Sequence, residues 1–377
     1  MRIAPALLVA TLVVPLLTVV ASEPPSDAAL PRLSVSVVIG GLDHPWDVAP
    51  ITKGRLLVTE RDRARLSVVR RGHRRTIPLV GARIWTGGET GLMGLEVDPR
   101  WRTNHRIYTC QGWSTSSSSH DVRVIAWRLT RHLREARPIR TLVSGLPSTS
   151  GRHGGCRLLI TRDGSLLVGT GDAATGTNPR SLTSLGGKTL RLNRFTGRPW
   201  RHNPFLGSAN ARTRLIYTYG HRNVQGLTQR RDGTLWSVEQ GTSRDDEVNR
   251  LVAGGDYGYN PVPGYNESVP MTDQSLPGRQ IEAAWSSGPT TDATSGGTFV
   301  PTLLKWQGYR GWLAVAALKN QKLIMLHFDR SGRLLTERTE VTDRGRLRTA
   351  VVAPNGDLFV PTDNGNGQDV ILRVHPR

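Results

Sequence analysis

The sequence predicts an all-β fold, a six-bladed β-propeller, on three observations. A turn containing Gly or Asn, followed by an apolar and β-rich stretch, recurs six times along the 377 residues. Successive copies lie about 45 to about 80 residues apart, which accommodates a four-stranded blade with its loops. No long window shows helical periodicity, and the frequent Gly and Pro interrupt any such window.

The six copies share turn residues that suit a tight hairpin and then aliphatic, aromatic or β-branched residues, typical of a strand packed on both faces. In chain order they are residues 53–58, 104–109, 163–168, 232–237, 310–315 and 355–360. Six blades that close into a ring leave no open sheet edge. A β-sandwich or barrel with incidental turn repeats is the alternative.

The N-terminal residues predict export. Arg2 precedes an almost wholly apolar run over residues 3–20, and Val19-Val20-Ala21 offers a small-residue cleavage site. We therefore expect a cleaved signal peptide at 1–21, a linker at 22–33, the propeller at 34–377 and a secreted protein. Because the run approaches the length of a short membrane span, an uncleaved anchor is the alternative. The polar segment that follows carries no stop-transfer charges, which favours cleavage.

The chain is strongly basic, with a formal net charge of +20 and a pI of about 11.2. Such a balance is compatible with nucleic-acid binding. However, the Arg residues are scattered, with no long basic run and no nucleic-acid motif, so we expect no nucleic-acid partner. Attraction to an anionic cofactor, or peripheral association with an anionic wall or membrane surface, fits the charge better.

The two cysteines, Cys110 and Cys156, lie on expected strands of neighbouring repeats. Outside the cytosol such a pair is more often a disulfide than two free thiols. We expect a bridge here, with free thiols as the alternative, because the sequence does not give the Cα separation that a bridge requires.

A first cluster of candidate site residues is Arg152-His153-Gly154-Gly155, followed by Gly171-Asp172. A His beside two glycines lies on a backbone that a ligand can approach closely. Asp172, at the end of the next expected strand, is placed to hold the imidazole in one tautomer and raise its basicity. Taken alone, a His beside Gly is more often a surface or turn histidine.

Two further clusters follow. Residues 220–227 hold Arg222 and Asn223, a guanidinium fork and an amide that suit carboxylate or quinone oxygens; a turn tied by hydrogen bonds is the alternative. Residues 238–247 set acidic side chains beside a Gly turn, which suits a hard cation such as Ca²⁺, although the EF-hand spacing is missing. A solvated acidic loop is the alternative there.

Three basic residues near the C-terminal end of the sequence, here called the three late cations, complete the set of candidate site residues. Lys319 ends an apolar strand, and Arg346 and Arg348 flank Leu347, so we expect both arginines on one face of a strand. A single cation at a strand end usually faces solvent. Three cations presented by successive blades predict an anion site.

Taken in order, these motifs resemble the soluble pyrroloquinoline-quinone (PQQ) dependent sugar dehydrogenases, the glucose/sorbosone and aldose sugar dehydrogenase family. The resemblance covers nearly the whole chain after the signal peptide. Its segments are residues 41–46, 88–94, 153–155, 171–172, 184–188, 220–227, 317–319 and 345–348. The family fold is a six-bladed propeller, in agreement with the repeat count.

The resemblance implies a role for each matching residue. His153 is the base that takes the proton of the sugar C1 hydroxyl, oriented by Asp172, while hydride passes to PQQ. The residues implied to bind PQQ are Arg222, Asn223, Gln240, Thr291, Lys319, Arg346 and Arg348, with Arg222 also stabilising charge on the quinone oxygen. Glu89 and Arg152 lie on the substrate side. The carbonyls of Gly241 and Thr242 are implied to bind an activating Ca²⁺.

The chain departs from the family pattern at two matching positions. Arg152 stands where the glucose enzymes carry an Asp that contacts sugar, and Thr242 replaces a common Pro. The substrate is therefore expected to be an aldose or related sugar rather than glucose in particular. The stretch 285–296 also fits only loosely.

We thus expect an exported quinoprotein that oxidises the C1 hydroxyl of a sugar to the lactone and passes its electrons to an external acceptor. The alternative is a non-catalytic propeller that binds wall glycan or a protein. A hydrolase on the same scaffold is a weaker option, because no nucleophile is evident. His153, Asp172 and the three late cations separate these readings, since a binding module has no need for that set.

Overall fold

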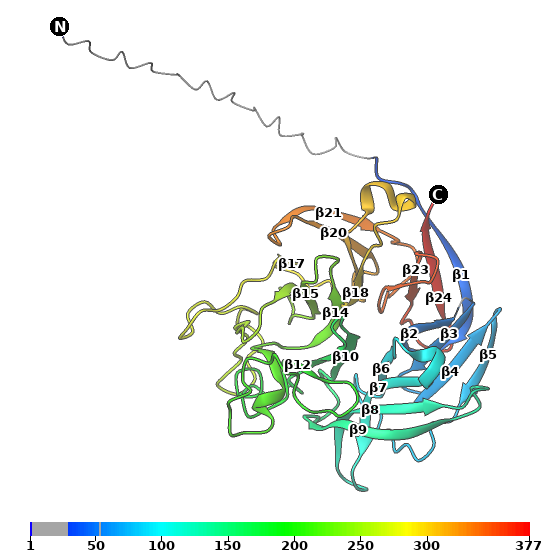
Figure 1. Ribbon diagram of the computed structural model, residues 1–377, viewed down its shortest axis with the longest axis horizontal. Coiled ribbons are helices and arrows are strands. Elements are labelled where there is room, and N and C mark those ends of the chain that lie inside the picture. The colour runs from blue at the N-terminus through cyan, green and yellow to red at the C-terminus, as the bar shows by residue number, and fades with distance from the viewer. Residues whose placement is uncertain (2–28, 53) are drawn as a thin grey trace.

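The computed structural model describes Met1 and residues 29–52 and 54–377, so the expected signal peptide lies outside the described residues apart from Met1. The chain folds into six four-stranded antiparallel sheets arranged in a ring (Figure 1). The predicted six-bladed propeller is therefore confirmed. Among the described residues, no helix is long and apolar enough to cross a membrane.

Each blade runs from an inner strand beside the central channel to an outer strand at the rim. The inner strands of consecutive blades contact one another. They are β2 (Pro45–Thr52), β6 (Leu92–Val97), β10 (Gly155–Ile160), β14 (Val224–Gln229), β18 (Thr294–Phe299) and β22 (Val351–Val352).

The second strands explain the sequence repeat, because each of the six copies runs from the turn before a second strand into that strand. These strands are β3 (Arg55–Glu60), β7 (Arg106–Ser114), β11 (Ser165–Thr170), β15 (Leu235–Glu239), β19 (Leu313–Ala317) and β23 (Leu358–Pro361). The turn residue has positive φ in every case, for example +86° at Gly164 and +94° at Gly233. The repeat therefore marks the one hairpin that all blades share.

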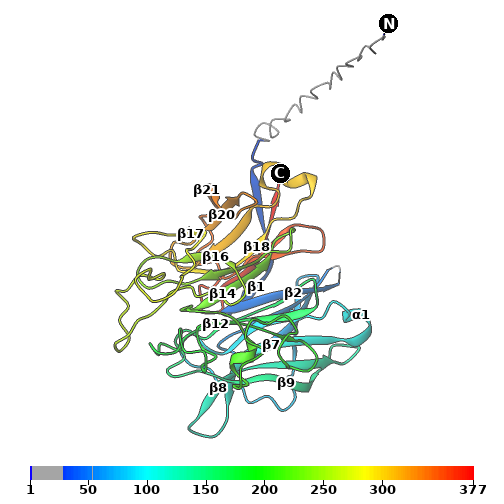
Figure 2. The same ribbon diagram turned by 60° about the vertical axis from the view of Figure 1, so that its left-hand side comes forward.

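The third strands are β4 (Arg65–Arg70), β8 (His120–Leu129), β12 (Lys188–Asn193), β16 (Glu247–Leu251), β20 (Leu323–Phe328) and β24 (Asp369–Pro376). The outer strands are β5 (His73–Ile77), β9 (Ala136–Leu146), β13 (Ile216–Tyr219), β17 (Trp285–Ser286), β21 (Leu334–Glu340) and β1 (Leu33–Leu42). The helices are short: α1 (Trp101–Asn104), at the edge of the ring in Figure 2, and the 3₁₀ turns η1 (Thr213–Leu215) and η2 (Leu304–Tyr309).

The two ends of the propeller sequence close the ring. β1 is the outer strand of the last blade and pairs with β24 from Leu33 opposite Pro376 to Leu42 opposite Asp369 (Figure 1). Apolar side chains fill the spaces between adjacent blades; Leu57 of blade 1, for example, belongs to the same buried cluster as Trp127 of blade 2. This arrangement leaves the channel walls free to carry polar residues.

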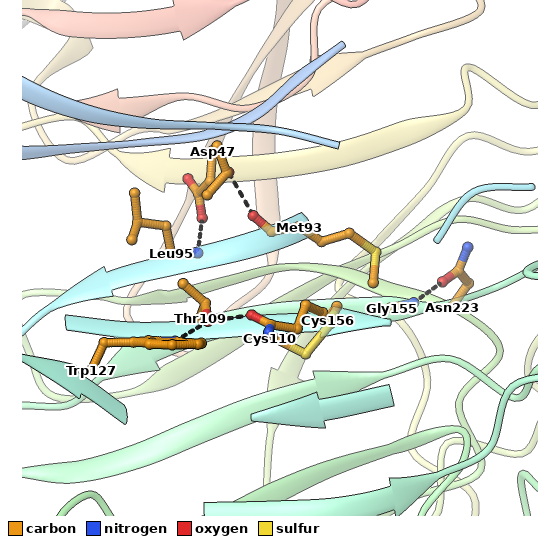
Figure 3. Close-up of a disulfide and its surroundings, with 11 residues drawn as sticks. Asp47, Met93, Leu95, Thr109, Cys110, Trp127, Gly155, Cys156 and Asn223 are labelled. Carbon is orange, nitrogen blue, oxygen red and sulfur yellow. Dashed lines mark hydrogen bonds between the residues drawn. A yellow bond between two sulfur atoms is a disulfide. The ribbon is translucent and has the colours of Figure 1, made fainter. Parts of the chain in front are cut away.

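A disulfide joins blades 2 and 3. Cys110 on β7 bonds to Cys156 on β10, with Cα atoms 5.4 Å apart, as the placement of the cysteines on neighbouring repeats predicted (Figure 3). Cys156 has φ of +78° at an irregularity of the β10–β11 ladder. The bridge therefore fixes the start of β10 through Cys156, which lies three residues after His153.

Candidate active site

The candidate site lies where inner strands begin and second strands end. Antiparallel pairing places these points side by side in each blade: Gly155 opposes Thr170, and Val224 opposes Glu239. Loops from all six blades therefore meet at one end of the channel, as is usual for sites in propellers. Residues far apart in the sequence converge there.

His153 and Asp172 form the pair that the sequence predicted. Nδ1 of His153 lies 2.8 Å from Oδ1 of Asp172, and both residues are buried. With the proton on Nδ1, donated to the carboxylate, Nε2 carries a free lone pair, and it makes no hydrogen bond within the described chain. This arrangement suits a general base.

Backbone packing around His153 requires glycine. His153 has φ of +52°, and a Cβ on Gly171 would stand 1.7 Å from the His153 carbonyl oxygen. Only glycine allows this approach. The Gly171-Asp172 turn thus supports the base through its main chain as well as through its carboxylate.

Tyr265 and Glu267 belong to the site and were not predicted. The Tyr265 hydroxyl donates to Oδ2 of Asp172 over 2.7 Å and lies 3.0 Å from Nδ1 of His153. Burial and the charge of Asp172 raise the pKa of Tyr265 far above its usual range, so the hydroxyl stays a donor. Glu267 accepts from Arg222 over 2.7 Å and from Arg152 over 3.1 Å.

An amide network extends from the base along the channel. Oε2 of Glu89 accepts from the main-chain nitrogen of His153 over 3.1 Å and from Asn223 over 3.4 Å. Oδ1 of Asn223 in turn accepts from the Gly155 nitrogen over 3.0 Å (Figure 3). Gln240 Oε1 accepts from Asn223 over 3.5 Å. Four predicted site residues are therefore linked directly.

A recess of about 100 Å³ opens beside this network. Four predicted site residues line it: Glu89, Gln240, Arg346 and Arg348. The other lining residues come from five blades and are Trp46, Arg61, Met93, Gly154, Gly155, Gln225 and Leu318. Arg61, Arg346 and Arg348 line the recess with a single carboxylate, Glu89, while Asp62 and Asp363 pair with Arg61 and Arg348 from outside the lining. The lining therefore presents mostly guanidinium groups, as an anion site requires.

Arg346 and Arg348 do not lie on a strand, contrary to the prediction, because they precede β22. Leu347, which lies between them, forms an isolated bridge to Thr362. Both nevertheless line the recess. Lys319 is exposed and follows Leu318 of the lining without lining the recess itself. The three cations are thus gathered at one end of the channel, two inside the recess and one beside it.

Asp363 anchors Arg348. The two form a buried ion pair, and Nδ1 of His44 bonds Asp363 over 2.6 Å. Burial alone would raise the pKa of Asp363, but the charge of Arg348 and the His44 hydrogen bond outweigh it and hold that pKa well below its usual range. Arg346 also lies 3.9 Å from this carboxylate, so Asp363 is shared by two arginines and His44.

Two guanidinium groups of the candidate site have a nitrogen without a hydrogen-bond partner. Nε of Arg222 and Nε of Arg348 are buried without a hydrogen-bond partner in the described chain. An unsatisfied buried donor costs about 1 to 3 kcal/mol, more when charged. Arg348 lines the recess and Arg222 belongs to the neighbouring hydrogen-bond network, so the residues present fit an anionic, carbonyl-rich cofactor.

Hydrogen bonds also hold the loop at residues 238–247, which the sequence predicts to bind a cation. The Gly241 nitrogen donates to Asp246 over 2.8 Å, and the carbonyls of Gly241 and Thr242 accept no hydrogen bond from the described chain. Thr291 donates to the same Asp246 over 3.0 Å and does not line the recess. Free main-chain carbonyls are ligands that Ca²⁺ accepts.

Arg61 is the recess residue that sequence reasoning missed, although a signal for it exists. It follows β3 as Asp172 follows β11 and Gln240 follows β15, each just past a second strand. The repeat therefore marks the position. Tyr265 and Glu267 come from the long connection between β16 and β17, which carries no such signal.

Comparison with known proteins agrees with this geometry. Aldose sugar dehydrogenase YliI of Escherichia coli is 30% identical over 363 residues, covering 93% of this chain and 95% of that protein. The PQQ-bound aldose sugar dehydrogenase of Streptomyces coelicolor superposes with a TM-score of 0.75 at 28% identity, over 93% of this chain and all of that one. The apo aldose sugar dehydrogenase of E. coli gives 0.82 at 27% identity, over 92% and 100%.

The fold and site thus define an oxidoreductase, a sugar dehydrogenase of the PQQ type. The family model described as Glucose / Sorbosone dehydrogenase matches residues 42–373. The chain belongs to the glucose/sorbosone dehydrogenase family.

Proposed function

We propose that this protein is an exported quinoprotein that oxidises the C1 hydroxyl of an aldose or related sugar to the lactone. The observation that carries the proposal is the buried His153–Asp172 pair at 2.8 Å, with Nε2 unbonded, beside an arginine-lined recess. A base and an anion site at one channel end are what hydride abstraction from an alcohol requires.

The chain's own residues divide the work. His153 takes the hydroxyl proton on Nε2, and Asp172 stabilises the imidazolium that forms. Glu89, bonded to the His153 main chain, and Arg152 stand on the substrate side. Arg222 supplies positive charge where negative charge develops on the acceptor oxygen. Each step uses a group whose position is already fixed by hydrogen bonds.

PQQ, when bound, supplies the hydride acceptor. Its carboxylates would be bound by Arg346, Arg348 and Lys319. Its quinone side would contact Arg222, Asn223 and Gln240, and Thr291 would support the wall of the cofactor site. The recess, at about 100 Å³, would hold only part of a tricyclic quinone. The Gly241 and Thr242 carbonyls would hold Ca²⁺. The two electrons then leave to an external acceptor, and the net positive charge would favour peripheral contact with an anionic surface.

Turnover assays test this proposal directly. Protein loaded with PQQ and Ca²⁺ should reduce an artificial dye when an aldose is added, and a calcium chelator should remove that activity reversibly. His153→Ala should lower kcat by about 10² to 10⁴-fold while PQQ still binds, because general-base catalysis contributes that range. His202→Ala, at an exposed loop position, is the matched control and should be fully active.

A PQQ titration followed by absorbance completes the design. Full turnover by the His153 variant would remove it from the base role. Failure of the wild type to bind PQQ, or to oxidise any member of a broad sugar panel, would favour a non-catalytic propeller instead.

A further inference from the structure

A second, wider cavity lies at the other end of the channel. Its volume is about 670 Å³, within the ~300–1,000 Å³ typical of small-molecule sites. All six inner strands, or the residues beside them, contribute to its wall, whereas the recess of the active site has about 100 Å³. The base and the predicted cations do not reach it.

Arg157 closes the inner end of this wide cavity. Its Nη1 pairs with Oδ2 of Asp47 over 2.8 Å, and its Nε donates to the Gln225 carbonyl over 2.7 Å. Its Nη2 is buried and has no hydrogen-bond partner in the described chain. Because a buried unsatisfied donor is costly, this nitrogen points to an acceptor that the protein does not supply.

Glu96 stands beside this pair and also lines the cavity. Its oxygens accept from the main-chain nitrogens of Val97 over 3.1 Å and Ile160 over 3.3 Å. Burial and the charge of Asp47 raise the pKa of Glu96 to about 8. At pH 7 the carboxyl is therefore mostly neutral and offers an O–H donor, while Arg157 and Asp47 cancel in charge.

Three threonine hydroxyls add to the polar lining, and Asp98, Arg100 and Arg102 also belong to it. Thr228, Thr298 and Thr349 come from or precede three different inner strands, and none of their hydroxyls hydrogen-bonds the described chain. Each hydroxyl can donate and accept at once. Apolar side chains stand between these polar groups: Val48, Ile51, Leu159, Leu227 and Val351.

We propose that the wide cavity is a binding site for a neutral, polyhydroxylated small molecule of monosaccharide size. Such a molecule offers acceptors to Arg157, donors and acceptors to the threonines, and C–H faces to the apolar wall. At the inner end a charged ligand would find no free counter-ion, because Arg157 is already paired with Asp47, and the lining arginines Arg100 and Arg102 are exposed to solvent. The site is separate from the active site, with Trp46 and Gln225 of the recess and Arg157 lying between them.

Binding experiments on the holoprotein test this proposal with probes that turnover does not consume. Methyl β-D-glucopyranoside and myo-inositol have no anomeric hydroxyl to oxidise, and titration followed by saturation-transfer NMR gives their Kd. We expect saturable binding of at least one probe. Thr228→Val and Thr298→Val should each weaken it about fivefold, the loss of roughly one hydrogen bond.

Thr339→Val is the matched control, because it makes the same change on the exposed outer strand of the blade that carries Thr298. Thermal unfolding should show all three variants folded, and dye reduction should be unchanged. Three outcomes would overturn the proposal: no saturable binding of either probe, binding that both cavity variants leave intact, or inorganic phosphate binding there in place of the polyols. Loss of catalysis in the active-site variants would leave this result unaffected.

Discussion

Two buried aspartate–arginine pairs line the channel, and they differ in what surrounds them. In the recess, Asp363 pairs with Arg348, and Arg346, Arg61 and His44 lie close by. Toward the wide cavity, Asp47 pairs with Arg157 alone, and Glu96 adds a second acid. The first pair is therefore surrounded by further basic groups, and the second pair lies beside another acid.

The pKa shifts express this difference. Burial tends to raise the pKa of both aspartates; the cations reverse that effect at Asp363, whereas burial prevails over Arg157 at Asp47, whose pKa is raised. An anionic ligand would further compensate guanidinium groups that are partly removed from water. The recess therefore suits a polyanionic cofactor, while the wide cavity suits a neutral ligand.

The largest expected effect comes from removing the carboxylate in the recess. Asp363→Asn leaves Arg348 buried without its counter-ion and should lower the free energy of unfolding by about 3 to 5 kcal/mol at pH 7. Urea unfolding measures it. Because the folded-state pKa of Asp363 is depressed, its contribution is present above about pH 4 and is lost as pH falls, so wild type and variant should converge in acid.

Asp343→Asn is the control, since that carboxylate is largely exposed and its ion pair with Arg344 lies at the surface. It should leave the unfolding midpoint unchanged at every pH. Equal stability of Asp363→Asn and wild type at pH 7 would contradict the charge asymmetry between the two pairs. If added PQQ restores the stability of Asp363→Asn, that result would support the charge asymmetry further.

A smaller effect on the free energy of unfolding, with the opposite pH dependence, is expected from Glu96 in the wide cavity. The pKa of Glu96 is raised to about 8 in the folded chain, so its contribution to stability is complete below about pH 4.5 and is lost as pH rises through 8. Glu96→Gln stays neutral throughout. Relative to wild type, the variant should therefore gain stability between pH 5 and pH 8.5, by roughly 3 to 4 kcal/mol.

Comparing wild type with Glu96→Gln isolates the titration of Glu96. Glu247 is also buried, with its pKa raised to about 8, but it titrates in both proteins. Urea midpoints at four pH values suffice. A constant difference between wild type and Glu96→Gln would show that Glu96 is ionised at neutral pH in the folded state, and the wide cavity would then be acidic.

The repeat in the sequence predicted the blade count, and the structure shows that it marks more. It falls on the second strand of each blade, and Asp172, Gln240 and Lys319 each lie just after the end of such a strand. The same rule selects Arg61, which no motif had suggested. Positions defined by a repeating hairpin are thus predictable, because the blade geometry fixes where each hairpin ends.

Residues outside the repeat were not predictable in the same way. Asp47, Glu96 and Arg157 lie on inner strands that read as ordinary β structure, and only their burial and mutual distances single them out. Tyr265 comes from the connection of more than thirty residues between Leu251 and Trp285. The path of such a loop depends on tertiary contacts rather than on a local pattern.

Tyr265 gives the smallest predicted effect and the most specific one. Its hydroxyl donates to Oδ2 of Asp172, which draws negative charge away from the oxygen that faces His153. In Tyr265→Phe the carboxylate should stabilise the imidazolium more strongly. The acid limb of the kcat/KM profile should therefore move to higher pH, with kcat at its optimum changed less than tenfold. A purely structural role would lower kcat equally at all pH values and leave the profile in place. Tyr309→Phe, which removes a hydroxyl bonded to Glu340 outside the site, is the matched control and should change neither.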